Sequence, residues 1–245
     1  MSHRFYVEPG DIQGGQAVVR GDEHRHLARA SRLKADDEVI LLDGRGGEIR
    51  AVIEKIRRDR TECAVLERCD THIEAPIRLT VAVAVIKSQR MNWAIQKACE
   101  LGVAAIWPFH AARSVRTHKG EQSNKVEHWN RVVISAAKQS GRALFPVVRP
   151  PLSFETLLTS ASGFSPRLLF HQGAEADQWG RVPDRAQASE MIAVFGPEGG
   201  FTDGEFAAAR EAGFEVVGLG PRTLRAETAV VAGAAILLHR LGDIK

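Results

Sequence analysis

The sequence predicts an α/β fold in two parts, a small β domain over residues 1–74 and an α/β domain over residues 75–245. The first part holds short β-prone runs at close spacing, which favours a small barrel or sandwich. In the second part β runs alternate with helical patterns, which implies parallel strands covered by helices. The segment THIEAP, at residues 71–76, separates the two rhythms and is typical of a linker.

In the first part the β-prone runs cover residues 4–8, 15–20, 37–56 and 61–69. Within the third run, DGRGG at residues 43–47 separates two β segments and predicts a hairpin turn. Residues 21–34 have a helical pattern, and Asp22 is the expected N-cap.

In the second part strands and helices follow one another in the α/β rhythm. The expected strands cover residues 77–86, 103–109, 146–150, 167–171, 190–196 and 214–220. The expected helices cover residues 91–102, 124–142, 154–161, 203–213 and 227–242. The last helix is apolar nearly all round, so we expect it to be buried in a core or against a second subunit, and a homodimer is the favoured reading.

The composition is that of an ordinary globular protein, with 44% hydrophobic and 26% charged residues. No apolar run approaches the roughly 20 residues that span a membrane, and the first residues lack the apolar region of a signal peptide, so we expect a cytoplasmic protein. Cys63, Cys69 and Cys99 are an odd number without C-x-x-C spacing, which supports neither a disulfide framework nor a zinc site. We expect no metal.

Positive charge is concentrated in the middle of the chain. Residues 86–149 hold 11 Lys and Arg against three Glu, a net charge of +8. Such a surface suits a polyanion, although a solvated basic face explains the same bias.

Two Gly-Pro turns near the C-terminus predict a ligand site. FGPEGG follows the strand that ends at Phe195, and LGPRTLRAET follows the strand that ends near Leu219. Ligands of open parallel sheets bind at the carboxyl ends of the strands, where both turns lie. Neither phosphate fingerprint is present, and Glu198 would repel a phosphate, so a nucleotide-like ligand without phosphates fits better. A Gly-Pro pair that merely ends a strand is the alternative for either turn alone.

The motifs GPEGGFT and LGPRTLRAETA together resemble the signature of the SPOUT-class RNA methyltransferases, in particular the family that methylates N3 of a uridine in 16S ribosomal RNA. The segments HRHLARASRLKADDEVILLDG, KSQRMNWAIQKACELGVAAIWPF, SVRTHK and WNRVVISAAKQSGR match that family in the same order. The resemblance covers nearly the whole chain, although GPEGG alone would not be specific.

The resemblance implies a PUA-like N-terminal β-barrel, a C-terminal α/β trefoil-knot domain, a homodimer, and S-adenosyl-L-methionine as cofactor. This cofactor has no phosphate and carries a sulfonium cation, which Glu198 would not repel. The expected cofactor contacts are Leu169, His171, Gly196, Pro197, Gly199, Gly200, Leu219, Gly220, Leu224 and Thr228.

For catalysis we expect Arg225 to stabilise the uracil anion, and Glu198 or Glu227 to accept the N3 proton directly or through water. Each has a structural alternative. Arg225 would pair with Glu227 or anchor a phosphate, Glu198 would bond its own loop, and Glu227 would complement the helix dipole.

The expected partner is 16S rRNA in the small ribosomal subunit. The residues expected to hold RNA phosphates are Arg4, Arg25, Arg29, Arg32, Lys87, Arg90, Arg113, Arg116, Lys119, Lys138 and Arg142. Lys138 stands where the family more often has an acidic residue.

Three other functions stay open at this point. The chain could be a SPOUT enzyme that acts on tRNA or on another rRNA site. It could also be a non-catalytic RNA-binding factor in ribosome assembly, although that role needs no ligand loops. An enzyme of phosphate-bearing nucleotides is disfavoured by the missing fingerprints.

Overall fold

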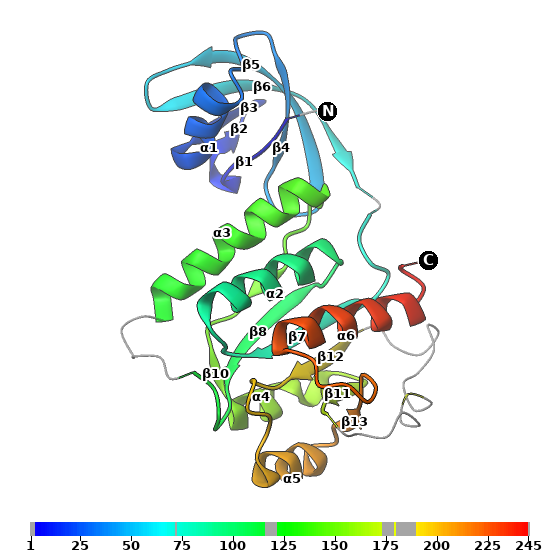
Figure 1. Ribbon diagram of the computed structural model, residues 1–245. Helices are drawn as coiled ribbons and strands as arrows, with labels where there is room; N and C mark the ends of the chain where they lie inside the picture. The colour runs from blue at the N-terminus through cyan, green and yellow to red at the C-terminus, as the bar shows by residue number, and fades with distance from the viewer. Residues whose placement is uncertain (1–2, 72, 116–121, 173–178, 180–189, 245) are drawn as a thin grey trace. The chain divides into compact units, whose positions relative to one another are not determined.

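A computed structural model of the protein describes residues 3–71, 73–115, 122–172, 179 and 190–244 (Figure 1). By its contacts the chain divides into two units, Met1–Glu74 with Ile134–Phe145, and Ala75–Val133 with Pro146–Lys245. The sequence prediction gives residues 134–145 to the second domain, whereas their contacts lie within the first unit. The assignment of residues 1–74 and 75–245 as two domains stays a prediction.

The first unit is built on one six-stranded sheet in the order β1-β4-β5-β6-β3-β2. Its strands are β1 (Arg4–Tyr6), β2 (Ile12–Gln13), β3 (Gln16–Arg20), β4 (Glu38–Leu42), β5 (Gly47–Ile56) and β6 (Arg60–Asp70). β4 and β5 pair antiparallel, which confirms the predicted hairpin, and β1 pairs parallel with β4. The β architecture expected for the N-terminal part is therefore confirmed.

Helical segments cover only a small part of this unit. A 3₁₀ turn, η1 (Pro9–Asp11), precedes β2, and α1 (Gly21–Arg25) continues into a π-helical turn, η2 (His26–Ala30). Leu27 of η2 joins the buried core of the sheet. The His24 ring lies 2.9 Å from the hydroxyl of Thr61, which gives this buried imidazole a polar partner.

Two details of the predicted helix at residues 21–34 are wrong. The residue at the N-cap is Arg20, and Asp22 lies in the first turn, where its carboxylate pairs with Arg25. The helical turns end at Ala30, and Arg32 has a φ of 54°. Arg32 therefore does not continue the helical row of Arg25.

The C-terminal end of α3 (Gln122–Ser140) and the residues after it carry two ion pairs of the first unit. Lys138 Nζ lies 2.6 Å from Glu23 Oε1, and Arg142 Nε lies 3.1 Å from Glu74 Oε2. Arg142 is only 4% exposed. The prediction that Arg142 holds RNA phosphates is wrong because its guanidinium is buried against a carboxylate, and Lys138 is likewise engaged by Glu23.

The second unit is built on a seven-stranded sheet in which every pairing is parallel, in the order β10-β8-β7-β12-β11-β13, with β9 also paired to β8. Its strands are β7 (Arg78–Ala84), β8 (Ala105–His110), β9 (Val147–Val148), β10 (Leu152–Ser153), β11 (Arg167–Phe170), β12 (Glu190–Phe195) and β13 (Glu215–Val217). The predicted parallel α/β architecture is confirmed. β12 lies between two strands that precede it in the chain; the trefoil knot stays a prediction.

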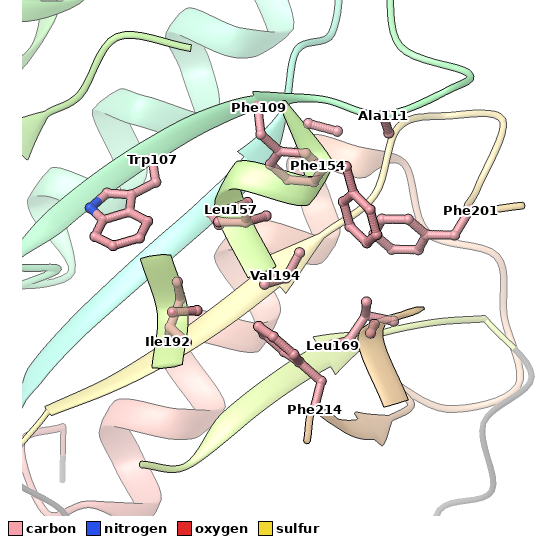
Figure 2. Close-up of a cluster of buried hydrophobic side chains, with 14 residues drawn as sticks. Trp107, Phe109, Ala111, Phe154, Leu157, Leu169, Ile192, Val194, Phe201 and Phe214 are labelled. Atoms are coloured by element: carbon pink, nitrogen blue, oxygen red, sulfur yellow. The ribbon is translucent and has the colours of Figure 1, made fainter. Parts of the chain in front are cut away.

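Helices cover both faces of this sheet (Figure 1). The helices of this unit, besides the N-terminal part of α3, are α2 (Ser88–Glu100), α4 (Phe154–Ser160) with the 3₁₀ turn η3 (Ala161–Gly163), α5 (Asp203–Glu211) and α6 (Ala226–Arg240). α2 and α6 pack side by side, and α6 contacts β7 and β12. The opposite face packs against α4 and α5 through the cluster in Figure 2, where Phe109, Phe154 and Phe201 meet.

α6 lies close to the sheet because of a glycine. A Cβ at Gly233 would stand 2.6 Å from Phe195 Cε1 and 3.2 Å from Phe170 Cζ. The two rings stack with their centroids 4.5 Å apart, at the carboxyl ends of β12 and β11. The predicted burial of the last helix is therefore confirmed for one face.

We expect Gly233→Ala to lower the free energy of unfolding by about 1–3 kcal/mol, because the added methyl overpacks the two buried rings. The matched control is Gly204→Ala in α5, where no described atom lies within 4 Å of an added Cβ. Since alanine has the higher helix propensity, the control is expected to be neutral or stabilising by up to about 1 kcal/mol. Urea unfolding measures both; equal stability of the two variants would contradict the close contact.

Candidate functional site

A cavity of about 330 Å³ opens at the carboxyl edge of the parallel sheet. β11, β12 and β13 end at Phe170, Phe195 and Val217, and the loops that follow each strand form its walls. The predicted residues that line it are His171, Gly196, Pro197, Glu198, Gly199, Gly200, Leu219, Gly220 and Leu224. Both Gly-Pro turns therefore meet at one cavity.

The glycines of these turns serve different purposes. Gly200 and Gly220 have φ values of 69° and 93°, and no described atom lies within 4 Å of a Cβ added to either. A Cβ at Gly196 would instead meet the Phe201 ring at 2.8 Å, and one at Gly199 would meet Arg113 at 3.2 Å. Thus the first two allow the left-handed backbone of the loops, while Gly196 makes room for internal packing rather than for a ligand.

One wall of the cavity is aromatic and uncharged. Phe170 and Phe195, stacked on each other, both line it. The His171 ring meets Phe206 edge to face at 4.5 Å between centroids. Partial burial lowers the pKa of His171 below its ordinary value, which favours the neutral imidazole. Phe170 and Phe195 are almost fully buried, so they back the cavity as an apolar wall.

The side of the cavity at Glu198 is charged. Arg90, in the first turn of α2, pairs with Glu198 through Nη1, and its Nε lies 3.7 Å from Glu227 Oε1. Glu227 is 9% exposed, and its Oε2 finds no hydrogen-bond partner in the described part of the chain. One guanidinium therefore joins two of the three residues predicted to be catalytic.

Two contacts hold the cavity loops together. The Gln172 amide donates to the hydroxyl of Thr223, which connects the loop after β11 to the loop after β13. Arg113 Nη1 donates to the Gly199 carbonyl oxygen at 2.8 Å. The sequence prediction omits Gln172, which follows the expected strand at residues 167–171, and Thr223, which lies inside LGPRTLRAET. Polar residues at the start of a loop carry no periodic signal that would have marked them.

Three predicted site residues lie elsewhere. Leu169 is fully buried in the core between the sheet and α5 (Figure 2). Thr228 lies on an exposed side of α6. Arg225 is the exposed N-cap residue of α6, and its side chain caps no described N–H group. Leu169 points to the opposite face of the sheet from Phe170 because strand residues alternate, which explains why the neighbour lines the cavity instead.

The residues predicted to bind RNA fall into three groups. Those engaged by a carboxylate are Arg4 with Glu48, Arg25 with Asp22, Arg90 with Glu198 and Glu227, Lys138 with Glu23, and Arg142 with Glu74. Those that are exposed and have no ion pair to a described residue are Arg29, Arg32, Lys87 and Arg113. Arg116 and Lys119 lie outside the described residues.

Among the residues that the structure describes, no three His, Cys, Asp or Glu side chains gather as a metal site would require. No described helix is long and apolar enough to cross a membrane.

Comparisons with known proteins agree with this architecture. The RNA methyltransferase domain family matches residues 73–238, and the RNA methyltransferase PUA domain family matches residues 19–66. The ribosomal RNA small subunit methyltransferase E of Mycobacterium bovis is 36% identical, over 97% of this chain and 90% of its own, and that of Bacillus subtilis is 32% identical over 92% of each. A crystal structure of the Neisseria gonorrhoeae enzyme of the same name, bound to S-adenosyl methionine, is 30% identical, covers 100% of both chains and has a TM-score of 0.89.

Both domain matches and the full-length similarity identify the same group of proteins. This chain therefore belongs to the RNA methyltransferase family, within the group named ribosomal RNA small subunit methyltransferase E.

Proposed function

We propose that this protein transfers the methyl group of S-adenosyl-L-methionine to N3 of a uridine in 16S rRNA of the small ribosomal subunit. The observation that carries the proposal is the single cavity at which both Gly-Pro loops meet, in a chain whose relatives over their full length are rRNA methyltransferases. The methyl acceptor atom and the identity of the uridine rest on the motif resemblance.

The cavity suits this cofactor in size and chemistry. Its volume of about 330 Å³ lies within the range of roughly 300–1,000 Å³ that is usual for small-molecule sites. Phe170 and Phe195 offer apolar surface, and backbone groups of the glycine loops offer the donors and acceptors that read an adenine edge. The Neisseria gonorrhoeae relative is described as bound to S-adenosyl methionine, which supports the same ligand here.

The reaction needs little covalent machinery from the protein. The bound cofactor supplies an electrophilic methyl group on a sulfonium. The chain has to hold the uracil ring in line with it and accept the N3 proton. Glu198 lines the cavity and is the better placed carboxylate for that proton, directly or through water. Glu227 contacts Arg90, which pairs with Glu198, and in this way Glu227 helps to position Glu198.

Arg225 stands at the start of α6, one residue before Ala226, which lines the cavity. Its exposed guanidinium is free to pair with the carbonyl oxygens of the uracil, where negative charge grows as the proton leaves. The exposed cations Arg29, Arg32, Lys87 and Arg113 supply phosphate contacts that set the register of the RNA. A ribosomal substrate of this kind places the protein in the cytoplasm.

We expect rRNA from cells that lack the protein to be free of N3-methyluridine in the 16S molecule, and the purified protein with S-adenosyl-L-methionine to restore it. Mass spectrometry of nucleosides from separated 16S, 23S and tRNA fractions measures the product. Restoration in tRNA or 23S rRNA would assign the enzyme to another target. No methyl transfer to any fraction, with RNA binding intact, would instead indicate a non-catalytic assembly factor.

We expect Gly199→Trp to abolish methyl transfer and to weaken S-adenosyl-L-methionine binding at least tenfold, because the indole fills the cavity, while RNA affinity stays near that of the wild type. The matched control is Gly204→Trp, at an exposed position of α5 where no described atom lies within 4 Å of an added Cβ. Calorimetry measures the cofactor and gel retardation measures the RNA. If Gly199→Trp kept its activity, the cofactor would have to bind elsewhere.

We also propose a homodimer that forms through the outer surface of α2 and α6. Trp93 on α2 and Ile236 on α6 are 41% and 39% exposed, although both are large and apolar. The two helices pack side by side, and α6 also carries the half-buried Val231 and Ala232, so the proposed interface spans both helices. Exposed apolar patches of this kind are typical of subunit interfaces.

We expect Trp93→Glu combined with Ile236→Glu to convert the dimer into a monomer, because two carboxylates would be buried in the interface without partners. Sedimentation velocity measures the mass. The control is Val147→Glu on β9, whose side chain is 61% exposed outside this face, and this variant is expected to stay dimeric. A wild-type chain that sediments as a monomer would overturn the proposed dimer.

A further inference from the structure

Three charged side chains form one network beside the cavity. Arg90 contacts both carboxylates, Glu198 through Nη1 and Glu227 through Nε at 3.7 Å. They come from three parts of the chain, because Arg90 lies in the first turn of α2, Glu198 in the loop after β12, and Glu227 in the first turn of α6. Of the three, only Glu198 lines the cavity itself.

The network has an unbalanced charge. Two carboxylates and one guanidinium leave a formal charge of −1, and Glu227 Oε2 has no hydrogen-bond partner among the described residues. A buried carboxylate oxygen left in this way is unusual, because its desolvation is not repaid by a donor. The network itself therefore carries a net negative formal charge beside the cavity.

Two other charged side chains line the cavity. Arg113 and Arg222 line it, and their side chains are exposed like that of Glu198, so solvent screens all three charges, whereas the Glu227 carboxylate is buried. Burial lowers the pKa of His171, which favours its uncharged form. The only carboxylate that lines the cavity is thus Glu198, among the residues that are described.

We propose that the network of Arg90, Glu198 and Glu227 makes the cavity selective for the cationic methyl donor over its neutral product, and so promotes product exchange. This inference rests on the proposed cofactor. In the transfer the N3–C bond forms, the C–S bond breaks with its electron pair going to sulfur, and the N3 proton leaves to a base or water. The sulfonium becomes an uncharged thioether, so the attraction to the network is lost at that moment.

Arg90 is the residue that sets the strength of this selection. Without Arg90 the wall would carry two carboxylates with no cation beside them. If Glu227 were replaced by a neutral residue, the remaining pair of Arg90 and Glu198 would have no net charge. Arg90 is therefore a positioning residue for the cofactor site and not the phosphate contact that its charge alone predicts. The same reasoning makes Glu227 act on the ligand from outside the cavity, through Arg90.

The test measures the dissociation constants of S-adenosyl-L-methionine and S-adenosyl-L-homocysteine for each folded variant by calorimetry. In Glu198→Gln the preference for the donor over the product is expected to fall by about five- to tenfold, since the carboxylate charge that lines the cavity is removed. In Glu227→Gln it is expected to fall by roughly threefold or more, although this residue does not line the cavity. Arg90→Lys keeps the charge and is expected to retain the wild-type ratio within about twofold.

Binding of the neutral product is the internal reference, because it reports an intact cavity in every variant. If Glu227→Gln weakened both ligands by the same factor, the network would have only a structural role and the inference would be overturned. If the wild-type protein bound neither ligand, the proposed function itself would fail. An unchanged ratio in Glu198→Gln with normal binding of both ligands would reject the selection while leaving the methyltransferase proposal intact.

Discussion

The parallel insertion of β12 between β7 and β11 is the constraint on which the rest of the second unit depends. Its register pairs Phe195 with both Phe170 of β11 and Val83 of β7, so the strands end at one edge and their loops must converge there. Because side chains alternate along each strand, neighbouring residues face opposite sides of the sheet. Ile192 and Val194 face α4 and α5 in the core, whereas Phe195 turns toward α6 and the cavity. A slip of one residue would exchange these faces and destroy the core and the cavity together.

Ion pairing decides how much of the basic charge is available for RNA. Five of the cations that the sequence marks for phosphate binding are engaged by carboxylates in this chain. An engaged surface arginine still contributes to the long-range field, but a buried one such as Arg142 serves the fold. The +8 bias of residues 86–149 therefore overstates the RNA surface. The exposed cations with no ion pair to a described residue, such as Arg113 and Lys87, carry more of that role.

The sequence predicts the elements well because their signals are local. Continuous apolar runs locate β7, β12 and α6, and the two Gly-Pro turns locate the cavity. What fails depends on contacts between distant residues. No local pattern reveals that Ile134–Phe145 packs with the N-terminal sheet, that Glu74 neutralises Arg142, or that Arg90 joins Glu198 to Glu227. The prediction puts Leu169 at the cavity, whereas its neighbour Phe170 lines it, because adjacent strand residues face opposite sides of the sheet. The missed capping box of α5 is different, since the spacing of Thr202 and Glu205 is a local signal that could have been used.

The same capping box helps to explain why a glycine-rich strand-to-helix turn is not a phosphate site here. Phosphates bind at helix N-termini whose N–H groups are free. At α5 the Thr202 hydroxyl accepts from the Glu205 N–H, and the Glu205 carboxylate accepts from the Thr202 N–H and also from that of Ala112. At α6 the acidic Glu227 occupies the first turn, where its negative charge offsets the positive end of the helix dipole. Both helix starts beside the cavity thus carry their own negative charge. They favour a ligand that is neutral or cationic where it meets the wall, and a phosphate placed there would meet carboxylates instead of free donors.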